Sequence, residues 1–176
     1  MVSGVPRSGT SLVMQMLAAG GYPVLADESR PPDDHNPRGY LEYAPVKALR
    51  RDTSWLPEAR GRAVKVIHAL VSVLPEGCDY RLVLVRRDLH EVVASQEAML
   101  PQPLEDGLGA DRLVEIFAAQ LTELETWLAA QPHFRVLRLE HEALLSEPRA
   151  AAEQLAAFLD GGLDAAAMAA VVDPKR

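Results

Sequence analysis

The chain has 176 residues, of which 48% are hydrophobic and 24% charged, and its formal net charge is −7. This length suits one domain, and this balance of residues is typical of a soluble globular protein rather than a disordered one. The acidic excess argues against broad binding of nucleic acid but allows a local basic pocket. Because Cys78 is the one cysteine and no Cys/His cluster has zinc spacing, we expect a reducing, cytoplasmic location and no metal.

The first twenty residues predict a short strand, a glycine-flanked loop from Gly4 to Ser11, and a helix ending near Ala19. The apolar part of this helix, about ten residues, is too short to span a bilayer, so we expect no membrane span. Backbone N–H groups at the start of such a helix attract anions. The sequence therefore predicts a phosphate cradle made of Pro6, Arg7, Ser8, Gly9, Thr10 and Ser11.

Gly4 and Gly9 have the spacing of the two glycines in the G-x-x-x-x-G-K-[ST] P-loop. In that loop a lysine reaches the terminal phosphates of ATP or GTP, and Thr10 stands at its position here. The cation of this loop is Arg7 instead. We therefore expect a phosphorylated donor that is not a nucleoside triphosphate.

The rest of the chain alternates predicted strands and helices. Runs rich in β-branched residues predict strands at Tyr22–Ala26, Ala63–His68, Tyr80–Val85 and Phe134–Leu139. Apolar periodicity and caps predict helices at Pro45–Asp52, Asp88–Leu100, Asp111–Ala130, Pro148–Leu159 and Asp164–Val172. Long loops, which are often functional, are expected at Asp27–Tyr40 and Pro101–Gly109. This alternation predicts an α/β fold whose parallel sheet is covered on both faces and binds ligands at the carboxyl ends of its strands.

A second anion site is predicted after the strand at 81–86. Arg87 follows this strand, and Ser95 lies eight residues later on the next helix, on a face that leans back toward the strand end. Arg86 competes for the role of Arg87, and the spacing of eight residues favours Arg87. A nucleotide phosphorylated at both its 3′ and 5′ positions requires two such anion sites.

The loop at 6–11 resembles the 5′-phosphosulfate loop of sulfotransferases, whose donor is 3′-phosphoadenosine 5′-phosphosulfate (PAPS), and is most similar to the tyrosylprotein and bacterial branches. Arg87 and Ser95 resemble the 3′-phosphate site of that family. The run at 138–148 resembles a strand and a following proline near the end of many members, with His141 where tyrosine is common. The next helix, which ends at Phe158-Leu159-Asp160-Gly161, resembles the helix that follows in those members. The resemblance implies a three-layer, P-loop-like sulfotransferase domain over residues 1–176, and it leaves open whether both ends are trimmed.

The resemblance also implies a metal-free reaction that yields adenosine 3′,5′-bisphosphate. By analogy with phosphoryl transfer, catalysis would be positioning, cationic stabilisation and base assistance. Arg7 would stabilise charge on the leaving 5′-phosphate, which the loop and the hydroxyls of Thr10 and Ser11 would hold. Lys65 is costly in an apolar strand unless its ammonium has a partner, and the family's lysine on this strand touches the transferring sulfonate.

The acceptor hydroxyl needs a base within hydrogen-bond reach. Glu28 is the first choice, because Asp27-Glu28-Ser29-Arg30 resembles the Glu-Glu-Thr-Arg stretch of tyrosylprotein sulfotransferases, whose second glutamate is the proposed base. His68 is the second, since imidazole titrates near neutral pH, although it follows Lys65 by three residues and the family's histidine follows by two. His35 and Glu42 are weaker candidates, better suited to shaping the acceptor pocket.

The acceptor class stays open between a small molecule, a glycan, a lipid and a peptide, because the loops at 27–52 and 100–110 follow no substrate code. The basic, glycine-rich loop that closes over the 3′-phosphate in cytosolic members has no counterpart before Arg176. An inactive nucleotide-binding module is therefore one alternative. A small P-loop kinase is another, although Thr10 replaces its lysine and no clear acidic magnesium ligand ends an apolar strand. The oligomeric state is not indicated by the sequence.

Overall fold

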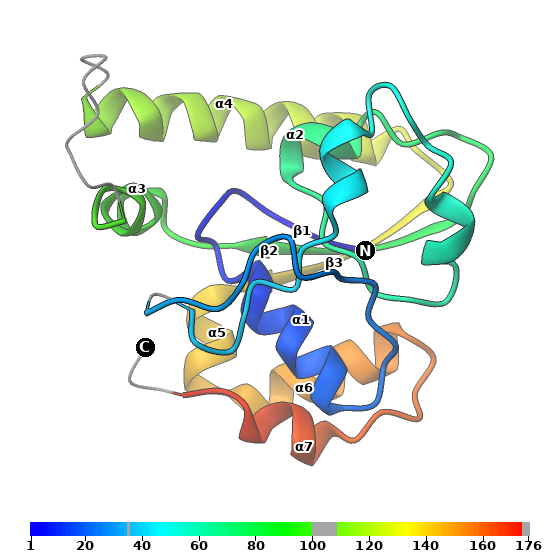
Figure 1. Ribbon diagram of the computed structural model, residues 1–176. Coiled ribbons are helices and arrows are strands. Elements are labelled where there is room, and N and C mark those ends of the chain that lie inside the picture. Colours follow the sequence, from blue (N-terminus) through cyan, green and yellow to red (C-terminus); the bar gives the residue numbers. More distant parts are fainter. Residues whose placement is uncertain (35, 100–108, 174–176) are drawn as a thin grey trace.

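The computed structural model describes residues 1–34, 36–99 and 109–173 (Figure 1). Its centre is a parallel sheet in the order β1-β2-β3, formed by β1 (Val2–Ser3), β2 (Tyr80–Arg86) and β3 (Phe134–Glu140). β2 and β3 pair along their whole length, from Tyr80 with Phe134 to Arg86 with Glu140. The chain is therefore mixed α/β with a parallel sheet, as the alternation of elements predicts.

Two extended segments continue the sheet beyond β1 without forming regular strands. The N–H of Val2 donates to the carbonyl of Val64 at 2.9 Å, and the N–H of Val66 donates to the carbonyl of Val2 at 3.0 Å. A parallel bridge then joins Val24 to Ala63. The parallel segments thus follow the order 22–26, 63–67, β1, β2, β3, and their carboxyl ends lie along one edge.

The strands predicted at Tyr22–Ala26 and Ala63–His68 are therefore reduced to isolated bridges. Pro23 has no N–H to donate, which limits pairing in the first of these segments. In the second, extended backbone ends at Ile67, because His68 begins a short helix, α2 (His68–Val71). The prediction that His68 ends a strand is wrong.

Helices cover both faces of the sheet (Figure 1). One face carries α1 (Thr10–Ala19), α6 (Pro148–Phe158) and α7 (Ala165–Ala170), and the other carries α2 and α4 (Ala110–Ala129). Side chains of β2 alternate between the two cores, because successive strand residues point to opposite faces. Val83 and Val85 pack with α1 and α6, whereas Leu82 and Leu84 pack with α4. None of the helices in the described ranges is long and apolar enough to cross a membrane.

The shorter helices surround the carboxyl edge of the sheet. α3 (Leu89–Glu97) begins at Asp88, whose carboxylate accepts from the N–H groups of His90 and Glu91, as the capping pattern predicts. The helix predicted at Pro45–Asp52 is a shorter 3-10 helix, η1 (Ala44–Ala48), and a second 3-10 helix, η2 (Leu56–Ala59), follows. α5 (His141–Ser146) directly follows β3 and was not predicted. His35 and the predicted loop at 101–108 lie outside the described residues.

Candidate active site

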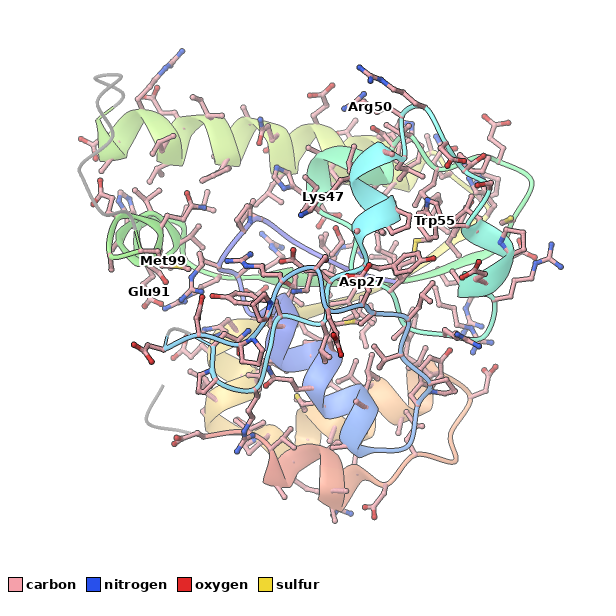
Figure 2. All side chains as sticks on the ribbon, viewed as in Figure 1. Asp27, Lys47, Arg50, Trp55, Glu91 and Met99 are labelled. Atoms are coloured by element: carbon pink, nitrogen blue, oxygen red, sulfur yellow. The ribbon has the colours of Figure 1, made fainter. Side chains whose placement is uncertain are left out.

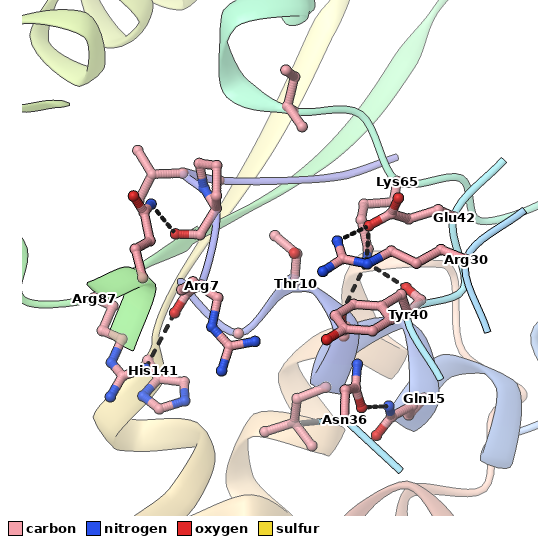
Figure 3. A pocket seen from close by; sticks show the side chains of 18 of the residues that line it. Arg7, Thr10, Gln15, Arg30, Asn36, Tyr40, Glu42, Lys65, Arg87 and His141 are labelled. Carbon is pink, nitrogen blue, oxygen red and sulfur yellow. Dashed lines mark hydrogen bonds and ion pairs between the residues drawn. The ribbon is translucent and has the colours of Figure 1, made fainter. Parts of the chain in front are cut away.

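A cavity of about 1180 Å³ opens at the carboxyl ends of the parallel segments. Its walls come from the loop after β1, from Lys65 to Ile67, from Arg87 after β2, from His141 after β3, and from residues of the 30–50 segment (Figure 3). Ligands of open α/β sheets bind at this edge. The volume exceeds the roughly 300 to 1,000 Å³ of ordinary ligand pockets, so the cavity is large enough for a small-molecule ligand.

The loop between β1 and α1 depends on Gly4 and Gly9. A Cβ atom on Gly4 would lie 2.7 Å from the carbonyl oxygen of Val85, and one on Gly9 would lie 2.6 Å from Cδ2 of His141. Gly9 also has φ of +102°, which disfavours any other residue. No side chain caps α1, and its first residues line the cavity, so the N–H groups of its first turn are open to an anion.

Arg7 and Ser8 occupy different environments within this loop. Arg7 lines the cavity and has φ of +71°, a left-handed conformation that is uncommon in non-glycine residues and costs conformational energy. Ser8 is fully buried, and its hydroxyl has no hydrogen-bond partner among the described residues. Ser8 therefore packs beneath the loop against Gly4. Of the predicted cradle residues, Pro6, Arg7, Gly9, Thr10 and Ser11 line the cavity, and Ser8 does not.

The two predicted anion motifs meet at Arg7. The Nε of Arg7 donates to the hydroxyl of Ser95 at 3.0 Å. The Nη1 of Arg87 donates to the carbonyl oxygen of Arg7 at 3.2 Å (Figure 3). Nε of Arg87 also donates to Glu91 at 2.9 Å. A guanidinium has five N–H donors, so both arginines retain donors for a ligand. The structure differs from the prediction in that Ser95 binds Arg7 rather than sharing a ligand with Arg87.

Arg86, the competitor for the role of Arg87, lies elsewhere. Its side chain is about half exposed, with Nε 3.8 Å from the carboxylate of Glu140. Arg87 is among the cavity-lining residues that the structure describes, and Arg86 is not. The spacing argument therefore selected the arginine that faces the cavity.

Lys65 reaches the partners that its apolar surroundings require. Its ammonium donates to the hydroxyl of Ser11 at 2.9 Å and to the carbonyl oxygen of Tyr40, and it lies 3.8 Å from the carboxylate of Glu42. Burial lowers the pKa of Lys65 to about 8, Glu42 opposes this shift, and Arg30 adds to it. Lys65 thus connects the start of α1, after the loop between β1 and α1, to the opposite wall of the cavity.

Residues 30–42 form that opposite wall (Figure 3). The guanidinium of Arg30 lies 3.5 Å from the centre of the Tyr40 ring and donates to Glu42 at 3.0 Å. Gln15 of α1 fixes this segment by donating to Asn36 at 3.1 Å and to the carbonyl of Gly39 at 2.9 Å. Sequence reasoning assigned no role to Arg30, Tyr40 or Gln15. The available signal was Gln15 itself, a polar residue in an otherwise apolar helix.

The structure places the candidates for the general base in different environments. Glu28 is exposed and is not among the described residues that line the cavity. His68 is buried, with Nε2 2.7 Å from the side-chain oxygen of Gln120 and its ring edge-on to Phe117, so it packs against α4. Glu42 does line the cavity, beside Lys65. Of the described residues weighed as the base, Glu42 is therefore the one that lines the cavity.

No protein-family model matches the chain, and no curated protein matches it either. Functional arguments therefore depend on the residues and on their arrangement.

His141 is a further cavity residue to which the sequence gave no role. It is the first residue of α5, directly after β3, and its ring lies against Gly9 in the loop between β1 and α1. Burial, with a smaller contribution from the charge of Arg87, lowers the pKa of His141 to about 4, and Glu91 opposes this shift. At neutral pH His141 is thus an uncharged imidazole. No group of His, Cys, Asp and Glu in the described ranges is arranged to hold a metal ion.

Proposed function

We propose that this chain is a sulfotransferase with the P-loop-like sulfotransferase fold, transferring a sulfuryl group from PAPS to a hydroxyl or amine. The observation that carries the proposal is the contact of Arg7 with Arg87 and Ser95 beside a glycine loop. Arg7 and Arg87 belong to two motifs eighty positions apart and line the same cavity, whereas Ser95 contacts Arg7 without being among the described lining residues. A donor with phosphate at both its 5′ and 3′ positions needs such a pair of sites.

The residues present fit such a donor. The loop leaves no room for a Cβ atom at Gly9 and offers the open N–H groups of α1, which suits a phosphate group. Arg7 and the hydroxyls of Thr10 and Ser11 would hold the 5′-phosphosulfate, and Arg87 would hold the 3′-phosphate. Ser95 would orient Arg7 by accepting from its Nε.

PAPS supplies a sulfuryl group on a phosphate leaving group. In the transfer, the acceptor oxygen bonds to sulfur, the bond between sulfur and the 5′-phosphate oxygen breaks, and adenosine 3′,5′-bisphosphate leaves. Lys65 and Arg7 would stabilise negative charge on the sulfuryl oxygens and on the leaving phosphate, because preorganised cations act most strongly where charge develops.

The acceptor proton goes to a carboxylate in this proposal. Glu28 stays a prediction from resemblance, and its exposed position would require the 27–30 segment to move toward the cavity. Glu42 needs no such movement, since it already lines the cavity 3.8 Å from Lys65. We therefore assign the base to Glu42. His68, which is packed against Gln120 and Phe117, supports the wall instead.

Thermal unfolding with adenosine 3′,5′-bisphosphate in the presence of a chelator tests the proposal. At a ligand concentration one hundred times the dissociation constant, binding adds about 2.7 kcal/mol to the free energy of unfolding. We expect this stabilisation without metal, and less from adenosine 5′-phosphate. Stabilisation by ATP with magnesium alone would replace the proposal with the kinase alternative. Bisphosphate binding without sulfuryl transfer to any hydroxyl or amine in a broad acceptor panel would indicate an inactive module.

A further inference from the structure

The cavity is basic although the chain is acidic. Among the described residues, its lining includes Arg7, Arg30, Arg38, Lys47, Arg50, Lys65 and Arg87 against Glu42, Glu97 and Asp173. The net charge of the whole chain is −7, so the charge balance of the described lining is opposite in sign to that of the chain. Arg7, Arg87 and Lys65 serve the donor in the proposed function, and Arg30 is paired with Glu42. The remaining cations exceed what the donor needs.

Lys47 and Arg50 are the two that stand apart from the donor residues. Both follow Glu42 along one wall, on η1 and the turn after it, and lie away from Glu91, the partner of Arg87 (Figure 2). Arg50 donates to the carbonyl of Ala69 at 3.1 Å. Within the described ranges, neither side chain forms an ion pair with a carboxylate. Two exposed cations therefore line the cavity at this end, and Asp27, whose carboxylate interacts electrostatically with Lys47, is not among the described lining residues.

An apolar surface lies beside these cations. Leu70 belongs to α2, and Ile67 directly precedes it. Ile67 is 45% exposed and is the one exposed large apolar side chain that the structure describes. Val46 of η1 and Leu113 of α4 line the same cavity. Because Arg50 binds α2 at Ala69, this apolar surface and the two cations are neighbours.

We propose that the acceptor is an amphipathic hydroxyl compound whose apolar body packs on Ile67, Leu70 and Leu113 and whose anionic group binds Lys47 and Arg50. This inference rests on the proposed function, and it narrows the acceptor to anionic compounds. Glu42 lines the cavity 3.8 Å from Lys65, and Lys47 and Arg50 follow it in sequence and line the same cavity, so the acceptor hydroxyl would contact Glu42 while its anionic group contacts the two cations. The anion is a carboxylate or an oxyanion such as a phosphate or sulfate ester.

Calorimetric binding without nucleotide tests the inference independently of the donor. The probes are hydroxyaryl and hydroxyalkyl carboxylic acids, beginning with 3-(4-hydroxyphenyl)propanoate, each paired with its uncharged methyl ester, and phenyl phosphate serves as the oxyanion probe. The best acid should bind about tenfold more tightly than its ester, as a charge-assisted contact predicts. Lys47→Met and Arg50→Met should each remove most of that difference. Lys47→Arg, which keeps the charge, should retain it.

Arg51→Met is the matched control, because Arg51 is exposed beside Arg50 and is not among the described residues that line the cavity. It should bind acid and ester like the parent protein. Equal binding of acid and ester in every pair, or an equal loss in Arg51→Met, would overturn the inference. Adenosine 3′,5′-bisphosphate affinity, measured on the same variants, should be unchanged. If Lys47→Met weakens the bisphosphate as much as the acid, the two cations serve the donor and the inference fails.

Discussion

The two sides of the cavity are built in different ways. On the side of the proposed donor, three cavity residues lie where regular elements begin or end: Arg7 between β1 and α1, Arg87 between β2 and α3, and His141 at the first position of α5. On the side of the proposed acceptor, residues 27–34 and 36–50 contain the 3-10 helix η1 and otherwise mostly irregular backbone. Backbone hydrogen bonds hold the strands and helices, and therefore the residues at their ends. The positions of these residues on the proposed donor side thus follow from the elements that flank them in sequence.

The acceptor side is positioned by contacts between distant side chains. Gln15 holds Asn36 and Gly39, and Lys65 holds the carbonyl of Tyr40. Asp27 accepts from the N–H of Ala44 at 2.7 Å. The comparison teaches that the residues of the loop side can be located from the spacing of a few residues, whereas the position of the facing residues depends on how one long segment is tied to the sheet.

The largest expected effect belongs to the acceptor side. Glu42→Gln keeps the size and polarity of the side chain but removes the base, so turnover should fall on the order of 10² to 10⁴-fold. Glu28→Gln is the matched control and should turn over nearly normally. Both variants should bind adenosine 3′,5′-bisphosphate like the parent. A collapse of turnover in Glu28→Gln with normal turnover in Glu42→Gln would return the base to the residue predicted from sequence.

The next effect concerns the donor side. Arg87→Ala should lose a charge-assisted phosphate contact worth about 1.5 to 3 kcal/mol, or roughly ten- to 150-fold in affinity for adenosine 3′,5′-bisphosphate. Arg86→Ala, which removes an exposed arginine on the same strand end, should change little. The readout is calorimetric affinity for the bisphosphate and for adenosine 5′-phosphate.

The second ligand distinguishes binding from support of the loop. Arg87 donates to the carbonyl of Arg7, so its loss could also disturb the 5′ site. If the affinity for adenosine 5′-phosphate falls as far as that for the bisphosphate, Arg87 supports the loop and does not bind the 3′-phosphate.

The fold was predictable where hydrophobic periodicity was long. The helix predicted at Asp111–Ala130 and the strand at Phe134–Leu139 match α4 and β3 to within one residue at each end. The short segments at 22–26 and 63–68 were overpredicted as strands, because a brief β-branched run does not reveal how many backbone pairs its neighbours offer. His68 is an example: it was predicted as the last residue of a strand, and it is the first residue of α2.

The position of Arg7 and Arg87 at the cavity was predictable for the same local reason, and the contact of Ser95 with Arg7 was not predicted. The glycine spacing and the eight residues between Arg87 and Ser95 describe turns that the chain makes by itself. Nothing local distinguishes Glu28 from Glu42, because both lie in one polar segment. Which of the two faces the cavity is decided by the contacts of Lys65 with Tyr40 and Glu42, which are distant from it in sequence.

The smallest effect is a pH dependence at the boundary between the two sides. Burial lowers the pKa of Lys65 to about 8 from its usual 10.5, so the ammonium is mostly charged at pH 7 and is lost as the pH rises through 8. If Lys65 stabilises the sulfuryl oxygens, kcat/KM for PAPS should fall up to about tenfold by pH 9.5. The arginine of Lys65→Arg stays protonated at pH 9.5, so kcat/KM of this variant should change little with pH over this range.

Stability should show the opposite trend, which gives an independent check. Between pH 8 and 10.5 the unfolded chain binds more protons at Lys65 than the folded chain does, so the contribution of Lys65 to the free energy of unfolding rises with pH in that window. Denaturant titrations at pH 7.5 and 9.5, compared between the parent and Lys65→Met, isolate this contribution. If kcat/KM of Lys65→Arg falls with pH as it does in the parent protein, another group is titrating. Lys65 then does not stabilise the reacting sulfuryl group.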